Sequence, residues 1–220
     1  MSKHAFWQAL VFTVIVFSLG IVLGFFLELG QSEKIYYNLI DSELNILDEQ
    51  LRQRIVSEEN VSCELAKESI FSFADKIYAD AFALESADGT GRLTDLTVLH
   101  KRYDLLRTLL LLEAEKLKKR CGEEFHIVLY FYLYNTEDIE ITSRQNYFSG
   151  QIFDLKLEYP EDIILIPIAV DTGVSSVELL VESRNVKNYP VIIVDGEKII
   201  AEFSTLEQLK TLVFSSTNSP

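Results

Sequence analysis

The sequence of 220 residues predicts an α/β domain preceded by an apolar amino-terminal helix and an all-α helical segment. Three observations support this prediction. Residues 5–27 carry no charged side chain, apolar residues then recur at helical spacing as far as Leu117, and patterns typical of strands and helices alternate after residue 125. Apolar residues make up 48% of the chain, whereas Gly and Pro number only 9 and 4, a composition typical of a folded protein.

The net charge is strongly negative and unevenly distributed. It amounts to -14 at pH 7, yet no Asp or Glu occurs before Glu28, and Lys3 is the only Lys or Arg in that part. The remainder of the chain is therefore acidic, and an acidic surface repels phosphate backbones. We expect no nucleic-acid partner.

Residues 5–27 form the first predicted element, a transmembrane helix. At about 1.5 Å per residue, a helix of this length crosses a hydrocarbon core about 30 Å thick. A cleaved signal peptide would have a shorter apolar region and small residues at its cleavage site, and the segment shows neither. It therefore predicts an uncleaved single-pass anchor in the lipid bilayer. Gly20-x-x-x-Gly24 would let two such helices approach closely, so a homo-oligomer stays open.

The charges that flank this helix predict its orientation. Lys3, His4 and the terminal amine precede it, whereas Glu28 and Glu33 follow it. By the positive-inside rule, residues 1–4 are expected in the cytoplasm and the bulk of the chain is expected to be extracytoplasmic.

Residues 28–122 predict a helical segment. Apolar residues at helical spacing indicate one helix over 31–56, which can continue directly from the anchor, and a second that begins near Val61. A third follows Thr94-Asp95 as its cap and ends in the basic run before Gly122. The second and third helices are joined by a short loop, so we expect them to pack antiparallel.

The only two cysteines, Cys63 and Cys121, lie at the start of the second helix and at the end of the third. Residue 92 is midway between them and falls in the predicted turn, so an antiparallel hairpin brings both to the same end. Outside the cytoplasm this arrangement predicts a structural disulfide. A redox centre would need a closer spacing such as Cys-x-x-Cys and an activating environment, and two reduced thiols would accompany the opposite membrane orientation.

Asn60-Val-Ser62 is an N-glycosylation sequon beside the predicted start of the second helix. Such triplets often occur by accident, and Asn60 is also suited to cap the helix. We prefer the helix cap and keep glycosylation of Asn60 as the alternative.

Residues 123–214 define a carboxyl-terminal module, and residues 215–220 form a polar tail that we expect to be flexible. Unbroken aromatic and aliphatic runs predict strands covered on both faces. Asp195-Gly196 fits a two-residue hairpin turn, and Ser204-Thr205 fits a helix cap. The predicted strands are 125–134, 163–170, 191–194 and 198–203, and the predicted helices are 142–157, 174–183 and one that begins after Thr205.

The order strand, helix, strand, helix, strand, strand, helix, with the stretch Tyr189-Pro-Val-Ile-Ile-Val-Asp-Gly196 opening the third strand, resembles the thioredoxin-like fold. This resemblance implies a central mixed four-stranded sheet flanked by helices. It also implies that Pro190 is a cis-proline and that the backbone at Tyr189 and Pro190 is a peptide-binding edge. The second strand would lie at the edge of the sheet, where Pro167 is tolerated.

The chain departs from the thioredoxin-like family where the first strand leads into the first helix. Family members with thiol chemistry carry Cys-x-x-Cys, or at least one Cys, at this place. Here residues 135–144 contain no Cys, and Glu137, Asp138 and Glu140 would raise the pKa of a thiol rather than lower it. The resemblance therefore implies a domain without dithiol exchange at this place.

Other chemistry finds no support in the sequence. His4, His100 and His126 lack metal-ligand spacing, and there is no Gly-rich phosphate loop. We predict no metal, no cofactor and no catalytic residues.

These predictions together favour a membrane-anchored, extracytoplasmic and redox-inactive module that binds an unknown protein partner, in assembly or in chaperone-like holding. Two alternatives stay open. One is thiol-disulfide exchange through Cys63 and Cys121. The other is a structural oligomer in which the helices from Gln31 onward form a coiled coil.

Overall fold

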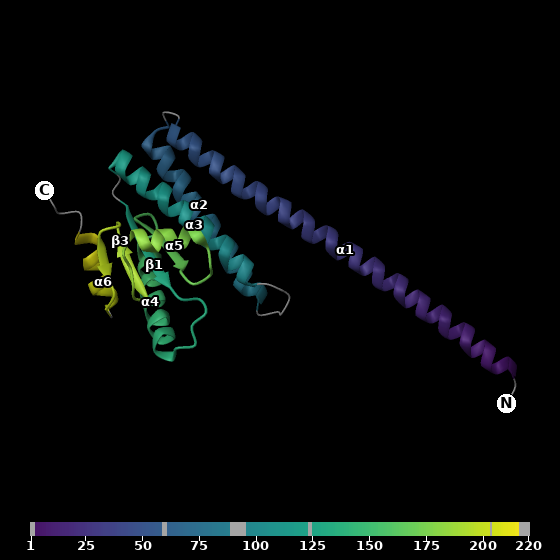
Figure 1. Cartoon of the computed structure of the whole chain (residues 1–220). Coiled ribbons are helices and arrows are strands. Elements are labelled where there is room, and N and C mark those ends of the chain that lie inside the picture. Colours follow the sequence, from purple (N-terminus) through teal and green to yellow (C-terminus); the bar gives the residue numbers. More distant parts are fainter. Residues whose placement is uncertain (1–2, 59–60, 89–95, 123–124, 203, 216–220) are drawn as a thin grey trace. The chain divides into compact units, whose positions relative to one another are not determined.

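The computed structural model describes residues 3–58, 61–88, 96–122, 125–202 and 204–215 (Figure 1). The chain divides into two compact units, Met1–Arg52 and Gln53–Pro220, of which the second contains both the helical hairpin and the sheet. The elements are α1 (Lys3–Glu58), α2 (Cys63–Asp88), α3 (Leu96–Cys121), β1 (His126–Tyr132), α4 (Ile139–Glu158), β2 (Ile163–Ala169), α5 (Ser175–Ser183), β3 (Val191–Val194), β4 (Lys198–Ile200) and α6 (Leu206–Phe214).

Helix α1 is one continuous helix, so the helix predicted over 31–56 continues directly from the predicted anchor, as the sequence allowed. Its segment Phe6–Gly24 has a mean hydropathy of 2.3 and is long and apolar enough to cross a membrane. The side chains of this segment are exposed, so they do not form part of a protein core. The helix thus presents an apolar surface of the length that a bilayer requires.

Helices α2 and α3 form an antiparallel hairpin and lie side by side in Figure 1. Cys63 and Cys121 are joined by a disulfide with their Cα atoms 5.8 Å apart, so the predicted pairing is confirmed. On the chain-entropy model, a link across 58 residues stabilises the fold by about 4 kcal/mol. At the start of α2, Ser62 Oγ accepts a hydrogen bond from Leu65 N at 3.3 Å, which is the contact of a helix cap.

The four strands form one mixed sheet in the order β2-β1-β3-β4. β2 is parallel to β1, whereas β3 is antiparallel to both β1 and β4. The two central strands consist almost wholly of buried aliphatic and aromatic residues, as their unbroken apolar runs predicted. The expected mixed four-stranded sheet flanked by helices is therefore present, and its second strand lies at the edge.

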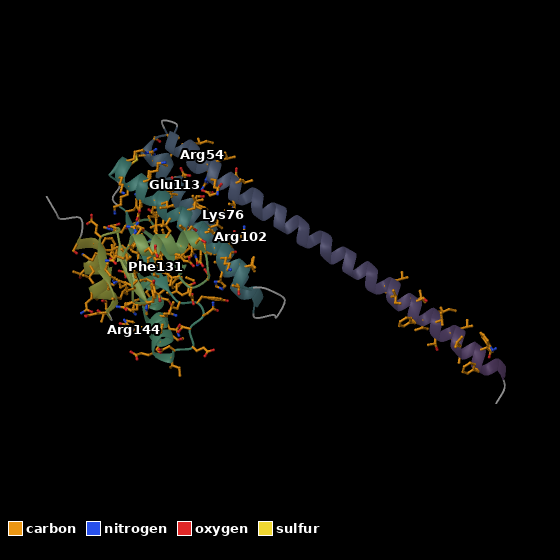
Figure 2. All side chains as sticks on the ribbon, in the orientation of Figure 1. Arg54, Lys76, Arg102, Glu113, Phe131 and Arg144 are labelled. Atoms are coloured by element: carbon orange, nitrogen blue, oxygen red, sulfur yellow. A yellow bond between two sulfur atoms is a disulfide. The ribbon has the colours of Figure 1, made fainter. Side chains whose placement is uncertain are left out.

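Helices cover both faces of the sheet. Val128 and Tyr130 of β1 belong to a core that also contains Phe148 and Leu209, so α4 and α6 cover that face. The alternate residues of β1 point to the opposite face, where α3 and α5 pack (Figure 1). Phe131 lies on β1 within the sheet in Figure 2 and is fully buried.

The outer edge of β2 is covered by side chains rather than by a further strand. Pro167 contributes no N–H to this edge. Three other backbone groups have side-chain partners: Ile163 O accepts from Lys156 Nζ (2.8 Å), Leu165 O accepts from Tyr78 Oη, and Ala169 N donates to Asp104 Oδ1 (3.1 Å). The hairpin and α4 thereby protect an edge that could otherwise pair with another chain.

Several predicted boundaries are corrected. The predicted helix start at Thr142 was wrong, because α4 begins at Ile139. β4 ends at Ile200, earlier than predicted, and Phe203 lies outside the described residues, as do Thr94-Asp95. The turn at Asp195 and Gly196 is confirmed by positive φ angles of 53° and 75°. The cap of α6 is confirmed as well: Thr205 and Gln208 form a capping box.

Candidate functional site

The candidate site lies at the end of the sheet where β1 finishes and β3 begins. Phe131, near the carboxyl end of β1, pairs with Val191, the first residue of β3. Tyr189 and Pro190 therefore lie beside the residues that follow β1. The Tyr189–Pro190 peptide bond is cis, the geometry implied by the resemblance. Pro190 is buried and Tyr189 half-buried, so this edge offers part of the Tyr189 side chain to solvent.

Two side chains fix the segment that follows β1. The Asp171 carboxylate accepts hydrogen bonds from Tyr134 N and Asn135 N, both at 2.7 Å. The Gln145 amide of α4 pairs with the backbone of Leu133, accepting from its N–H at 2.7 Å and donating to its carbonyl at 3.0 Å. Because Asp171, which follows β2, and Gln145 of α4 both bond to its backbone, the segment has one defined path.

Asp138 occupies the amino end of α4, the place where a reactive thiolate would lie in the family that the sequence resembles. Its carboxylate accepts hydrogen bonds from Glu140 N at 2.8 Å and from Ile141 N at 3.2 Å. A helix amino terminus stabilises an anion through its free N–H groups and its dipole, and here the anion is the chain's own. Glu137 and Glu140 are exposed beside it.

The two cysteines lie near the other end of β1. Lys118 Nζ donates to Phe125 O at 2.6 Å, which ties the end of α3, close to Cys121, to the start of β1. The seven residues of β1, at about 3.3 Å each, separate this end from Tyr189 by roughly 20 Å. The structure thus brings Tyr189, Pro190 and Asp138 to one end of the sheet and the disulfide to the other.

The end of the sheet near the disulfide also contains a polar cluster that the sequence did not predict. Asp195 Oδ1 accepts from Lys118 Nζ (2.6 Å) and Ile127 N (2.9 Å), and Asp195 Oδ2 pairs with His126 Nδ1 at 2.8 Å. Burial alone would raise the pKa of Asp195, but the hydrogen bonds from His126 and Lys118 outweigh it and hold that pKa below its ordinary value.

The sequence also singled out the three histidines and Asn60. The His100 ring lies 3.9 Å from the Tyr134 ring, measured between centroids. Asn60 and the side chain of His4 lie outside the described residues, so glycosylation of Asn60 stays a prediction. The preferred assignment of Asn60 as the helix cap was wrong, because Ser62, directly before α2, makes the cap contact. Within the described ranges, no group of three or more His, Cys, Asp or Glu side chains could hold a metal ion.

Sequence reasoning treated Asp138 only as part of an acidic cluster and overlooked its role as a cap. The signal was present, because Asp is a preferred N-cap residue and Ile139 opens the helical pattern directly after it. The cluster around Asp195 gave no local signal, since its other members lie 68 to 77 residues from Asp195.

Comparisons with known proteins add two likenesses. No family model matches the chain, and neither does any curated protein. A solved structure described as that of a malarial protein is 24% identical, with 41% of this chain and 96% of that chain covered, at a TM-score of 0.32. The germline-specific thioredoxin protein Deadhead (Thioredoxin-1) from Drosophila melanogaster is 19% identical, with 50% and 94% covered, at a TM-score of 0.29. The strand order defines the class of this chain: an α/β protein with a mixed four-stranded sheet.

Proposed function

We propose that this chain is a membrane-anchored, extracytoplasmic protein with a thioredoxin-like domain that binds polypeptide and performs no thiol chemistry. The observation that carries the proposal is the cap of α4. The Asp138 carboxylate takes the backbone N–H groups that would stabilise a thiolate, and the only two cysteines of the sequence are bonded to each other elsewhere.

The element order and the sheet order support the thioredoxin-like assignment. The second strand lies at the edge, as the resemblance implied, and Pro167 sits in it without breaking the ladder to β1. The cis bond before Pro190 is in the position that the resemblance implied.

The membrane topology rests on α1 and on the disulfide. Residues 5–27 lack charge, and Lys3 and His4 precede them, which favours a cytoplasmic amino terminus by the positive-inside rule. The Cys63–Cys121 disulfide supports an extracytoplasmic location for the rest, because disulfides persist in oxidising compartments.

Polypeptide recognition would use the backbone at Tyr189 and Pro190. An extended chain could form main-chain hydrogen bonds with the backbone at Tyr189, which precedes the paired residues of β3, and the half-buried Tyr189 ring would pack against one of its side chains. The fixed path of the segment that follows β1 keeps the neighbouring surface in one conformation, so little ordering opposes binding.

The proposal is tested with the full chain in detergent micelles and a permanently unfolded probe, reduced and carboxymethylated α-lactalbumin. We expect saturable binding by fluorescence anisotropy, weakened several-fold by Tyr189→Ala. Tyr147→Ala is the matched control, since Tyr147 is also a partly exposed tyrosine but lies on α4, where it donates to Ser204 O. Equal binding by wild type and Tyr189→Ala would remove Tyr189 from the mechanism, and no binding at all would reject the function.

Thiol-disulfide exchange is tested with the same preparation. We expect no reduction of insulin in the presence of a thiol donor. Activity that disappears in Cys63→Ser would replace the proposal with an enzymatic function at Cys63 and Cys121.

An exposed apolar row on α1 favours a structural oligomer as the second candidate function. Leu47, Leu51 and Ile55 follow one another at intervals of four residues and are 54%, 58% and 56% exposed. Lysine crosslinking of the full chain in micelles would give dimers if this row pairs with a second copy. Loss of those dimers in Leu47→Ser/Leu51→Ser would assign the oligomer to α1.

A further inference from the structure

A pocket of about 530 Å³ lies between the helical hairpin and α4, beside the outer edge of β2. Its size is within the range of small-molecule sites. Its walls come from α2, α3, α4, β1 and β2, and from the segment after β1. The residues that give it its chemical character are Tyr78, Tyr130, Tyr132, Tyr134, Phe153 and Arg107.

Of the described residues that line the pocket, Arg107 alone is charged. Its guanidinium lies 5.9 Å from the centre of the Tyr103 ring. It makes no hydrogen bond or ion pair within the part of the chain that the structure describes. Asp104 lies one turn earlier on α3, but it is fully buried, and its oxygens accept from Ala169 N at 3.1 Å and Thr172 Oγ1 at 3.0 Å. Among the described residues, Arg107 therefore forms no ion pair with a carboxylate, although its charge lowers the pKa of Asp104 against the larger effect of burial.

The charge of Arg107 affects the pKa of Tyr78, which also lines the pocket. Desolvation raises the pKa of the Tyr78 phenol, and Arg107 works against that rise. Tyr78 is thus neutral at physiological pH, and its hydroxyl already donates to Leu165 O. A ligand entering the pocket meets a positive charge beside a neutral phenol.

Tyr130 and Tyr132 line the pocket with their aromatic rings. The rings of Tyr130 and Tyr132 are stacked, with centroids 5.6 Å apart and planes inclined by 13°. Tyr130 Oη donates to Gln145 O at 3.1 Å, so its polar end is already bonded. Flat apolar groups pack well against such aromatic surfaces.

We propose that this pocket binds a carboxylate carried on a flat apolar group, with the carboxylate on Arg107 and the flat group against the tyrosines. A guanidinium binds a carboxylate through two parallel N–H···O bonds. A single cation in a protein of net charge -14 favours a monoanion over a phosphate dianion. The ligand is therefore an aromatic carboxylic acid, or an aromatic residue that ends a polypeptide.

The pocket shares one end of the sheet with the proposed polypeptide edge. Tyr132 at the end of β1 lines the pocket on the side of β2, whereas Tyr189 and Pro190 lie on the side of β3. Neighbouring strands are about 4.8 Å apart, so a bound chain passing Pro190 could place its last residue in the pocket. Binding of a polypeptide terminus in the pocket rests on the proposed function, whereas binding of a free acid does not.

The test uses the full chain in detergent micelles and isothermal titration calorimetry. The probes are 3-phenylpropionate, for the free acid, and the peptide Gly-Gly-Gly-Phe with a free carboxyl terminus, each compared with its amide. We expect the acid forms to bind about 10-fold or more tightly than the amides, because a charge-assisted bond is lost in the amide. Tighter binding of the peptide than of 3-phenylpropionate would identify a polypeptide terminus as the source, and the reverse would identify a small acid.

Arg107→Gln should weaken both acids about 10-fold or more and bring them to the level of the amides. Arg102→Gln is the matched control, because Arg102 lies on the same helix (Figure 2), is also 5.9 Å from the Tyr103 ring, and does not line the pocket. Binding to Arg102→Gln should stay within about 3-fold of wild type. Equal binding of acids and amides, or unchanged binding in Arg107→Gln, would overturn the proposal.

A second variant keeps the proposal testable if Arg107→Gln unfolds. Ser149 is exposed and lines the pocket from α4, so Ser149→Phe should fill the space and abolish binding without removing the charge. Retained binding in Ser149→Phe would place the acids elsewhere and overturn the proposal. Failure of the pocket is distinguishable from failure of the proposed function, because unfolded α-lactalbumin is measured separately through Tyr189→Ala.

Discussion

The two ends of the central sheet use their polar groups differently. Near the start of β1, Lys118 and His126 each bond to Asp195, and the Cys63–Cys121 disulfide lies close to the same end. At the finish of β1, the Arg107 charge faces a pocket. Polar groups that satisfy one another contribute to stability, whereas groups left facing a cavity contribute to binding. The comparison predicts that substitutions at the first end unfold the domain and that substitutions at the second end change what it binds.

The largest expected effect is loss of the disulfide. Cys63→Ala/Cys121→Ala should lower the free energy of unfolding by about 4 kcal/mol, because the unfolded chain regains the entropy of a 58-residue loop. Urea unfolding followed by circular dichroism measures the change, and wild type with a reducing agent is the control. A loss below about 1 kcal/mol would mean that the link does not restrain the unfolded chain as the entropy model requires.

Removal of the Asp195 carboxylate is expected to have the second-largest effect on the free energy of unfolding. Asp195→Ala should cost about 3 kcal/mol, because it leaves the half-buried Lys118 and the buried His126 without their partner. Asp195→Asn is the control, since Asn also tolerates the positive φ of 53° and keeps the shape of the side chain. Urea unfolding at pH 7 should rank wild type above Asp195→Asn and Asp195→Asn above Asp195→Ala.

The Asp195→Asn substitution also changes how the free energy of unfolding depends on pH. Because the folded pKa of Asp195 is depressed, its stabilisation is present above the unfolded value of about 3.9 and is lost as pH falls through the folded pKa. Asp195→Asn should therefore differ from wild type at pH 6 and approach it as the pH is lowered below 3.9. A constant difference between pH 6 and pH 2.5 would contradict this account.

A smaller loss is expected from Asp138→Ala at the opposite end. Its side chain caps α4 from an exposed position, so its removal should cost about 1 kcal/mol. Asp138→Ser retains an accepting oxygen and should recover most of the loss. Both are measured by thermal unfolding, and identical stability of all three proteins would show that solvent replaces the cap.

The smallest expected effect is that of Arg107→Gln on stability. Arg107 makes no ion pair or hydrogen bond among the described residues. The free energy of unfolding of the Arg107→Gln protein should therefore stay within about 0.5 kcal/mol of wild type. The same variant loses acid binding, so the two measurements separate stability from recognition. A loss of 2 kcal/mol or more, on the order of a buried-group substitution, would place Arg107 in the structural part of the molecule.

The sequence predicted features that depend on spacing along the chain. The hairpin and its disulfide followed from the position of residue 92 midway between Cys63 and Cys121. The strand at the edge followed from Pro167 and from the resemblance. Each of these features depends on the chemistry of neighbouring residues or on two positions placed symmetrically about a turn. Both can be recognised from the order and spacing of residues along the chain.

The sequence could not predict features that depend on which distant side chains meet. The pocket combines residues from five elements, and Tyr78 contacts Leu165 across 87 positions. Helical periodicity placed Tyr78 and Arg107 on helices without indicating which strand they would face. The start of α4 was misplaced for a different reason, because Asp138 was assigned to an acidic loop although it caps a helix.

The protected edge of β2 has a consequence for the order in which the chain is made. α2 and α3, which supply Tyr78 and Asp104, precede the sheet in the sequence. Amino-terminal parts are made first, so the hairpin is synthesised before Ile163. β2 therefore meets the cover of its outer edge as soon as it emerges, and two copies of the chain have little time to join edge to edge.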